Sequence, residues 1–219
     1  MISEKTVELN LTTEFINWLS HQHNTPYFAV GPTQAQEAQW GFDAGVFGGA
    51  TGALIQYKRA YVNGTTWEWK LNRTKAKDQL DRLQKLEAAG HAVFFAFPYF
   101  NTLGQIQSHR RRLLVHTFWF KPSQIMPTGG PNGHHEVRFD SATNKWSVHS
   151  DQGSDMPQPV SLADVISSID NAHNQLSELA RSFNEIFMDD LEQPPNSETE
   201  VLASTLSGMC IIGRGVGTQ

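Results

Sequence analysis

The segment at residues 91–97, HAVFFAF, constrains the fold more than any other part of the chain. Six apolar residues follow His91 without interruption, and Pro98 stops the run. A helical pattern over residues 73–89, with leucines three residues apart on one face, comes directly before it. A strand that is apolar on both faces has to be covered on both faces. The chain is therefore expected to be an α/β protein with a buried sheet.

Hydrophobic periodicity and turn residues predict the remaining elements. Strands are expected at residues 5–10, 27–30, 42–47, 52–58, 65–69 and 113–120, with a hairpin at 136–140 and 145–148. Further helices are expected at residues 13–22, 34–40, 102–112 and 161–187, the last being the longest and capped by Ser161. A polar linker at residues 150–159 divides the chain into an α/β domain, residues 1–160, and a C-terminal extension, residues 161–219. The extension is expected to be the long helix and an acidic, Gly-rich tail, packed on the domain or on a partner.

Composition excludes several classes of protein. No apolar run is long enough to cross a bilayer, and the first residues lack the basic and apolar regions of a secretory signal. The single cysteine, Cys210, cannot form an internal disulfide. The expected location is therefore the reducing cytoplasm, with no membrane contact.

The charges are distributed unevenly along the 219 residues, although the net charge is only −5. Residues 44–112 hold eleven Lys or Arg against four acids, a balance of +7. Residues 113–219 hold five against thirteen, a balance of −8. A local excess of positive charge favours a polyanionic partner. The alternative is that the lysines of residues 75–85 form an ordinary solvated helix face paired with nearby acids.

The stretch from Glu37 to Lys58 contains an isolated acid, Asp43, and the tripeptide Gln56-Tyr57-Lys58 at the end of an apolar run. Side chains two residues apart in a strand share a face, so Gln56 and Lys58 project together. If the two short strands pair as a hairpin, Asp43 can lie beside them. A carboxylate, an amide oxygen and a backbone carbonyl can hold a hard cation such as Mg²⁺.

These residues resemble the motif of the PD-(D/E)XK nuclease superfamily, in which an acid on one strand precedes a (D/E/Q)-x-K on the next. Asp43 matches the first acid, Gln56-Tyr57-Lys58 the second element, and Glu37 the Glu that often comes from the preceding helix. The sequence departs from the pattern in two ways. No proline precedes Asp43, and Gln56 replaces the usual acid, as in the Mrr-like branch. The resemblance covers residues 33–98 and implies a restriction-endonuclease-like αβββαβ core with a mixed sheet.

The resemblance also implies a function. The chain would be an endonuclease that needs Mg²⁺ or Mn²⁺ and cleaves phosphodiester bonds in nucleic acid, with DNA favoured, in restriction, repair or phage defence. Asp43, the carbonyl oxygen of Gln56, the backbone carbonyl of Tyr57 and Glu37 would be the metal ligands. Lys58 would orient the attacking water or neutralise the transition state. Candidate substrate-binding residues are Arg59, Lys70, Arg73, Gln79, Arg110, Arg111 and Arg112.

Two other function classes stay open. The chain can be a nucleic-acid-binding module that has lost cleavage, which the replacement of an acid by Gln56 supports. It can also be a structural or interaction subunit that forms a homodimer or binds a partner through the C-terminal helix. Taken singly, Asp43 also suits a turn and Gln-x-Lys a solvated strand end. The His21/His23 and His134/His135 pairs are expected to be structural rather than metal ligands.

Overall fold

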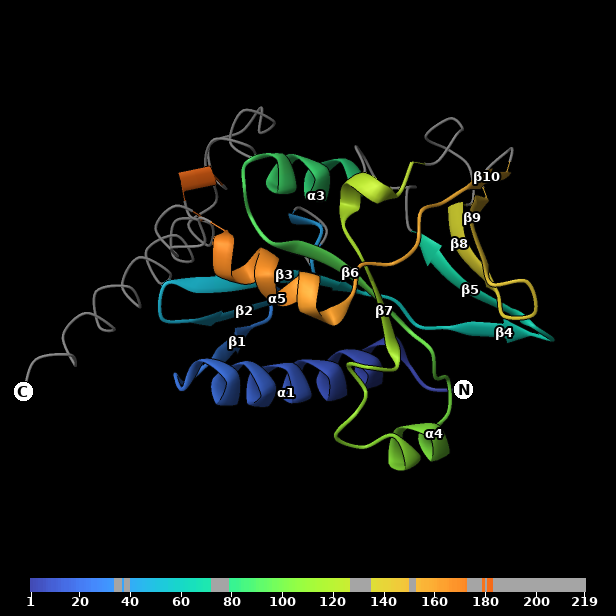
Figure 1. Cartoon of the computed structure of the whole chain (residues 1–219), viewed down its shortest axis with the longest axis horizontal. Coiled ribbons are helices and arrows are strands. Elements are labelled where there is room, and N and C mark those ends of the chain that lie inside the picture. The colour runs from blue at the N-terminus through green and yellow to red at the C-terminus, as the bar shows by residue number, and fades with distance from the viewer. Residues whose placement is uncertain are drawn as a thin grey trace, which may run out of the picture.

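The computed structural model describes residues 1–33, 37, 40–71, 79–126, 135–149, 153–172, 179 and 181–182. Within this part the chain forms two five-stranded sheets, an α/β arrangement as expected (Figure 1). The first sheet has the order β1-β2-β3-β6-β7, with bounds Phe28–Val30, Ala44–Gly48, Thr51–Tyr57, Val93–Pro98 and Thr117–Phe120. The second sheet has the order β10-β9-β8-β5-β4, with bounds Gly153–Asp155, Lys145–His149, His135–Asp140, Thr66–Leu71 and Tyr61–Asn63.

The first sheet is mixed and buried on both faces. β3 and β6 run parallel, and its other neighbouring strands are antiparallel. All six residues of β6 are buried, which confirms the strand predicted from the run at 91–97. Val93, Phe95 and Phe97 join one hydrophobic cluster, whereas Phe94 and Ala96 join the other, so alternate side chains enter opposite cores.

Helices cover both faces of the first sheet. α1 (Glu4–His23) and α5 (Leu162–Asn171) share one hydrophobic cluster with it. α3 (Gln79–Ala88) and the second sheet share the other cluster with it. Figure 1 shows α1 and α3 on opposite sides of the first sheet, with the second sheet beside them. α4 (Leu103–Ser108) and the short 3₁₀ helix η1 (Pro122–Gln124) lie on the connections before and after β7.

The prediction for the N-terminal segment is wrong. A single helix, α1, replaces the expected strand at residues 5–10 and the helix at 13–22. The spacing of Val7 and Leu11 fits both the two-residue period of a strand and the four-residue spacing of a helix face. Phe15 and Leu19 continue the four-residue spacing, so the buried side chains form one stripe along a helix. Ser3 caps the helix by accepting a hydrogen bond from the backbone N–H of Thr6 at 3.1 Å.

The strand predicted at residues 65–69 exists as β5, but it lies in the second sheet, between β4 and β8. Its exposure alternates, with Trp67 and Trp69 buried, as in a strand with one covered face. The first sheet instead takes β1, β2 and β3 as its first three strands, preceded by α1. The restriction-endonuclease-like core expected at residues 33–98 is therefore not confirmed, because its third strand does not belong to the first sheet.

Further segments also differ from the predictions. α4 ends at Ser108, and Arg111 lies in a turn with φ of +68°. β7 begins at Thr117 rather than at 113, and the predicted linker contains β10. α5 ends at Asn171, because Ala172 is extended, so the continuous helix over 161–187 is wrong. The acidic and Gly-rich tail lies outside the described residues.

The predicted hairpin at residues 136–148 is confirmed as β8 and β9. Among the described residues, no helix is both long and apolar enough to cross a membrane.

Replacing Trp69 with alanine should lower the free energy of unfolding by about 3–5 kcal/mol, as expected for a large side chain removed from a core. Trp69 is fully buried between the sheets and stacks on Phe97 and Trp146, with ring centroids 5.3 and 5.7 Å away. Urea denaturation measures the change. Leu103→Ala is the control, because Leu103 is 63% exposed and its removal should cost almost nothing. Equal effects for the two variants would contradict this account of the core.

Candidate active site

The hairpin of β2 and β3 brings the predicted acid to the predicted tripeptide. Ala44 pairs with Ile55 in the antiparallel ladder, and the backbone N–H of Asp43 donates to the carbonyl of Ile55 at 3.0 Å. Asp43 therefore lies just before β2, opposite the end of β3. The tripeptide Gln56-Tyr57-Lys58 ends β3 and continues its parallel ladder with β6, where the N–H of Lys58 donates to the carbonyl of Ala96.

One carboxylate oxygen collects the hydrogen bonds at this point. Oδ2 of Asp43 accepts from Nε2 of Gln56 and from the backbone N–H of Tyr57, each at 2.7 Å. Nε2 of Gln56 also donates to the backbone carbonyl of Tyr57 at 3.1 Å. Oε1 of Gln56 accepts from Nε2 of Gln79, at the start of α3, at 2.7 Å. The side chains of Asp43, Gln56 and Gln79 thus form one connected network, of which Gln56 is fully buried.

Lys58 is the cation of the site, and its partner comes from α1. Its Nζ lies 3.4 Å from Oε1 of Glu4, and the backbone N–H of Arg59 donates to Oε2 of Glu4 at 3.4 Å. Lys58 is only 6% exposed, whereas Glu4 borders solvent. Glu4 was not among the residues predicted from the sequence. The cap at Ser3, followed by apolar residues four apart, was the signal that could have placed it in the first turn of a helix.

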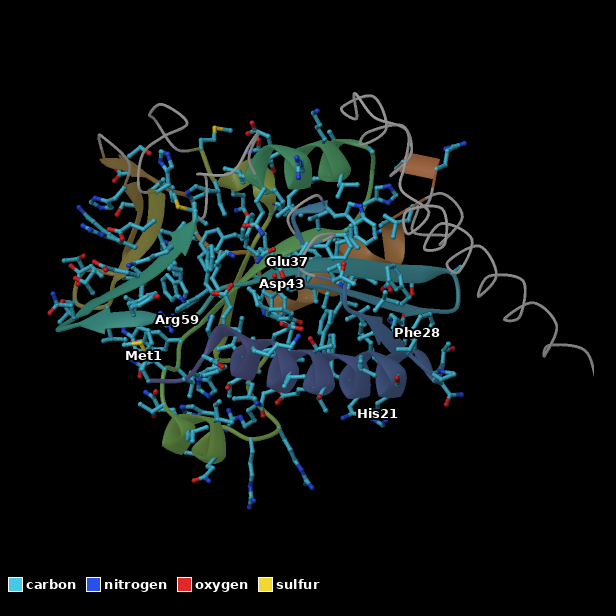
Figure 2. All side chains as sticks on the ribbon, turned by 180° about the vertical axis from the view of Figure 1, so that it is seen from behind. Met1, His21, Phe28, Glu37, Asp43 and Arg59 are labelled. Carbon is cyan, nitrogen blue, oxygen red and sulfur yellow. The ribbon has the colours of Figure 1, made fainter. Side chains whose placement is uncertain are left out.

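Burial raises the pKa of Asp43 to about 8. The positive charge of Lys58 lowers this pKa, the carboxylates of Glu37 and Glu4 raise it, and the hydrogen bond from the Tyr57 N–H lowers it. Glu37 is thus close enough to act on Asp43, and the two residues lie next to each other in Figure 2. A buried carboxyl that holds its proton near neutral pH is a common feature of functional sites.

The donors present fit a hard cation with few protein ligands. Within the described part of the chain, no three His, Cys, Asp or Glu side chains form a group that could hold a metal ion. Mg²⁺, however, is usually held by one or two carboxylates together with waters and substrate oxygens. Asp43 supplies one carboxylate, and the side chain of Gln56 and the backbone carbonyl of Tyr57 meet beside it. The two oxygens at this point, Oδ2 of Asp43 and the carbonyl of Tyr57, both accept from the Gln56 NH₂ group. A carboxylate and a backbone carbonyl are ligand types that Mg²⁺ and Mn²⁺ use.

A basic and aromatic cluster lies next to Lys58 along the chain. Nε of Arg59 donates to the hydroxyl of Tyr61 at 2.7 Å, and its guanidinium lies 4.6 Å from the ring centre. Nζ of Lys70, on β5, lies 4.8 Å from the same ring centre. Two of the predicted substrate-binding residues therefore share one aromatic side chain, which was not itself predicted from the sequence. We refer to Arg59, Tyr61 and Lys70 as the basic–aromatic cluster.

The other predicted substrate-binding residues have different positions. Gln79 reaches the network of Asp43 through Gln56. The exposed Arg110, Arg111 and Arg112 form a separate turn after α4, and the start of that helix is tied to the N-terminus by a hydrogen bond from the Ile2 N–H to the Asn101 carbonyl. Arg73 lies outside the described residues.

The histidine pairs are not brought to the site. Nδ1 of His23 lies 2.6 Å from the hydroxyl of Tyr27, at the opposite end of α1 from Glu4. His135 is buried at the start of β8, and His134 lies outside the described residues.

Comparisons of the chain with protein-family models, with curated proteins and with solved structures found no match.

Proposed function

We propose that the protein is a metal-dependent endonuclease that cleaves phosphodiester bonds in DNA. One observation carries the proposal: the Asp43 carboxylate, the Gln56 side chain and the Tyr57 carbonyl meet at one buried point. Lys58 is the next residue along the chain. These are the residue types that a hard cation and a phosphate require at a cleavage site.

The order of elements around the first sheet supports the proposal. Along the chain it runs α1, β1, β2, β3, α3, β6, with β4 and β5 inserted before α3. This is the αβββαβ order that the resemblance to the PD-(D/E)XK superfamily implies, with a mixed sheet. The acid lies just before β2 and the Gln-x-Lys at the end of β3, and these two strands are neighbours. We therefore propose a restriction-endonuclease-like core, made of different elements from those first expected.

Each residue then has a role in the chemistry. When bound, Mg²⁺ or Mn²⁺ would act as a Lewis acid and lower the pKa of a bound water. Asp43, Gln56 and the Tyr57 carbonyl would hold the ion, and Glu37 would complete its surroundings. The ammonium of Lys58 acts on Asp43 as a positive charge, so it lies near the proposed ion. From there Lys58 would donate to the attacking water or to a phosphate oxygen. Glu4 would hold Lys58 in position through their ion pair.

Nicking of a supercoiled plasmid tests the proposal directly. We expect conversion to the open-circular form with Mg²⁺ or Mn²⁺ and none with EDTA. DNA binding without cleavage under all these conditions would instead favour the second candidate, a binding module that has lost activity. The observation favouring that candidate is Gln56 itself, since an amide contributes no negative charge to the metal. A cytoplasmic role in restriction, repair or phage defence belongs to the same proposal.

The basic–aromatic cluster should contribute to DNA affinity through the phosphate backbone. Removing one side chain that neutralises a phosphate reduces the slope of log K against log salt by about 0.9. We expect Arg59→Ala and Lys70→Ala each to reduce the slope by about this amount, as measured by fluorescence anisotropy at several salt concentrations with EDTA present. Lys145→Ala is the matched control, because Lys145 is exposed on β9, away from β4 in the same sheet. Equal slopes for all three variants would remove the cluster from the DNA interface.

A further inference from the structure

The side-chain amide of Gln56 fills the position that the proposed cation needs. Its NH₂ group donates both of its hydrogens, one to Oδ2 of Asp43 and one to the backbone carbonyl of Tyr57. These two oxygens are the proposed ligands of the ion. An amide NH₂ carries partial positive charge, so it satisfies the two oxygens in the way that a cation would. In this form of the protein, therefore, the carbonyl oxygen of Gln56 points away from the proposed metal position.

The partners of Gln56 fix the orientation of its amide. In the reverse orientation, Oε1 would face the backbone carbonyl of Tyr57, which can only accept, and the Asp43 oxygen that already accepts from the Tyr57 N–H, which is unfavourable. On the other side, Oε1 of Gln56 accepts from Nε2 of Gln79 at 2.7 Å. Gln56 is fully buried, so no water can replace a missing partner without cost. The observed orientation is the one that pairs every polar atom of this amide.

We infer that binding of the ion turns the Gln56 amide by half a turn and that the Gln79 amide turns with it. The inference rests on the proposed metal site. Oε1 of Gln56 can become a ligand only if its NH₂ group faces Gln79 instead. Two NH₂ groups cannot bond to each other, so Gln79 has to present its own Oε1. Gln79 is then a positioning residue that controls access of the ion to Asp43.

The chemistry of glutamine explains why it suits position 79. An amide has a donor end and an acceptor end, so it can pair with Gln56 in both orientations. A carboxylate at this position can only accept, and it would favour the orientation with the Gln56 oxygen toward the ion. An ammonium can only donate, and it would favour the observed orientation. The residue at 79 should therefore set the affinity of the site for metal in a predictable direction.

Two variants of Gln79, each with a charge-matched control on the same helix, test this inference. Gln79→Glu should tighten Mn²⁺ binding about tenfold and Gln79→Lys should weaken it about tenfold, the size expected for a hydrogen bond to a charged group. Lys85→Gln changes the charge of α3 by the same amount as Gln79→Glu, and Asp81→Asn by the same amount as Gln79→Lys, both at exposed positions. The controls should change Kd less than threefold. Isothermal titration calorimetry with Mn²⁺ measures all four.

Nuclear magnetic resonance of the parent protein gives a second readout that needs no substitution. Without metal, the NH₂ protons of Gln56 should show Overhauser effects to the backbone amide proton of Tyr57, since both groups donate to the same Asp43 oxygen. With diamagnetic Mg²⁺ bound, these effects should disappear, and new ones to the Gln79 side chain should replace them.

The outcomes separate this inference from the proposed function. If the parent protein bound neither Mg²⁺ nor Mn²⁺, the proposed metal-dependent nuclease would fall. If it bound metal but the Overhauser effects of the Gln56 NH₂ group did not change, the joint rotation would be wrong and the nuclease proposal would stand. The same conclusion would follow if each Gln79 variant only matched its charge control.

Discussion

Replacing Asp43 with asparagine is expected to abolish metal-dependent cleavage and, at the same time, to stabilise the fold at neutral and alkaline pH. Cleavage should fall by at least about 10³-fold, because the variant lacks the one carboxylate at the centre of the site. Loss of activity together with a gain in stability is expected when a group needed for function lowers the stability of the fold.

The stability change follows from the raised pKa of Asp43. Its pKa is about 8 in the folded protein against 3.8 for an ordinary aspartate. Between these pH values the folded state binds more protons than the unfolded state, so stability is lost as pH rises from about 4 to about 8. Asparagine cannot ionise, yet its Oδ1 can still accept from Gln56 and from the Tyr57 N–H. We expect a gain of about 2–5 kcal/mol above pH 8 and little gain near pH 4.

Urea denaturation from pH 4 to pH 9 in EDTA, alongside the plasmid assay, measures both effects. Asp43→Ala is a useful comparison, because it removes one of the two acceptors of the buried Gln56 NH₂ and the acceptor of the Tyr57 N–H, and it should gain less stability, or lose some. Asp140→Asn is the control for charge, since Asp140 is a half-buried aspartate in the second sheet whose pKa is lowered by its hydrogen bonds with Thr143 and Ala142. A folded Asp43→Asn variant that cut DNA at the parental rate would disprove the assignment of the site.

Local sequence patterns were sufficient for the part of the site on the β2–β3 hairpin. Asp43 and Gln56 are only thirteen residues apart, and the two-residue turn at Gly49 and Ala50, where Gly49 has a φ of +59°, joins their strands. The strand at β6 was equally predictable, because an uninterrupted apolar run has few alternatives to a strand buried on both faces. In both places the structure depends on contacts between near neighbours in sequence or on the composition of one segment.

The contacts that sequence patterns missed join distant segments. Glu4 lies 54 residues before Lys58, and nothing local links a helix cap to a strand end. β5 joins the second sheet by pairing with β8, whose first residue is His135, so no pattern near β5 could assign its sheet. For α1, the alternation at residues 6–11 was ambiguous by itself. Leu9, which a half-buried strand would bury, is 57% exposed on the helix.

Replacing Lys58 with methionine should reduce cleavage by about 10²–10³-fold while metal binding is retained. Methionine keeps the apolar stem of a side chain that is almost fully buried, so the change removes mainly the charge. A positive group that meets the developing charge of a phosphate typically contributes a factor of this size. Lys58 also lowers the pKa of Asp43, so its removal should shift the pH dependence of Mn²⁺ affinity to higher pH. Calorimetry across pH and the plasmid assay measure the two effects separately.

Glu4→Gln distinguishes a supporting role for Glu4 from a direct one. The ion pair between Glu4 and Lys58 is long, at 3.4 Å, and the Glu4 side chain is 41% exposed, so it should contribute less than about 1 kcal/mol. If Glu4 only positions Lys58, the variant should lose less than tenfold in cleavage and keep its Mn²⁺ affinity. If cleavage instead fell as far as in Lys58→Met and Mn²⁺ affinity fell with it, Glu4 would be a metal ligand. Asp43 would then share the ion with a carboxylate from α1, and the ion would depend less on the oxygen of Gln56.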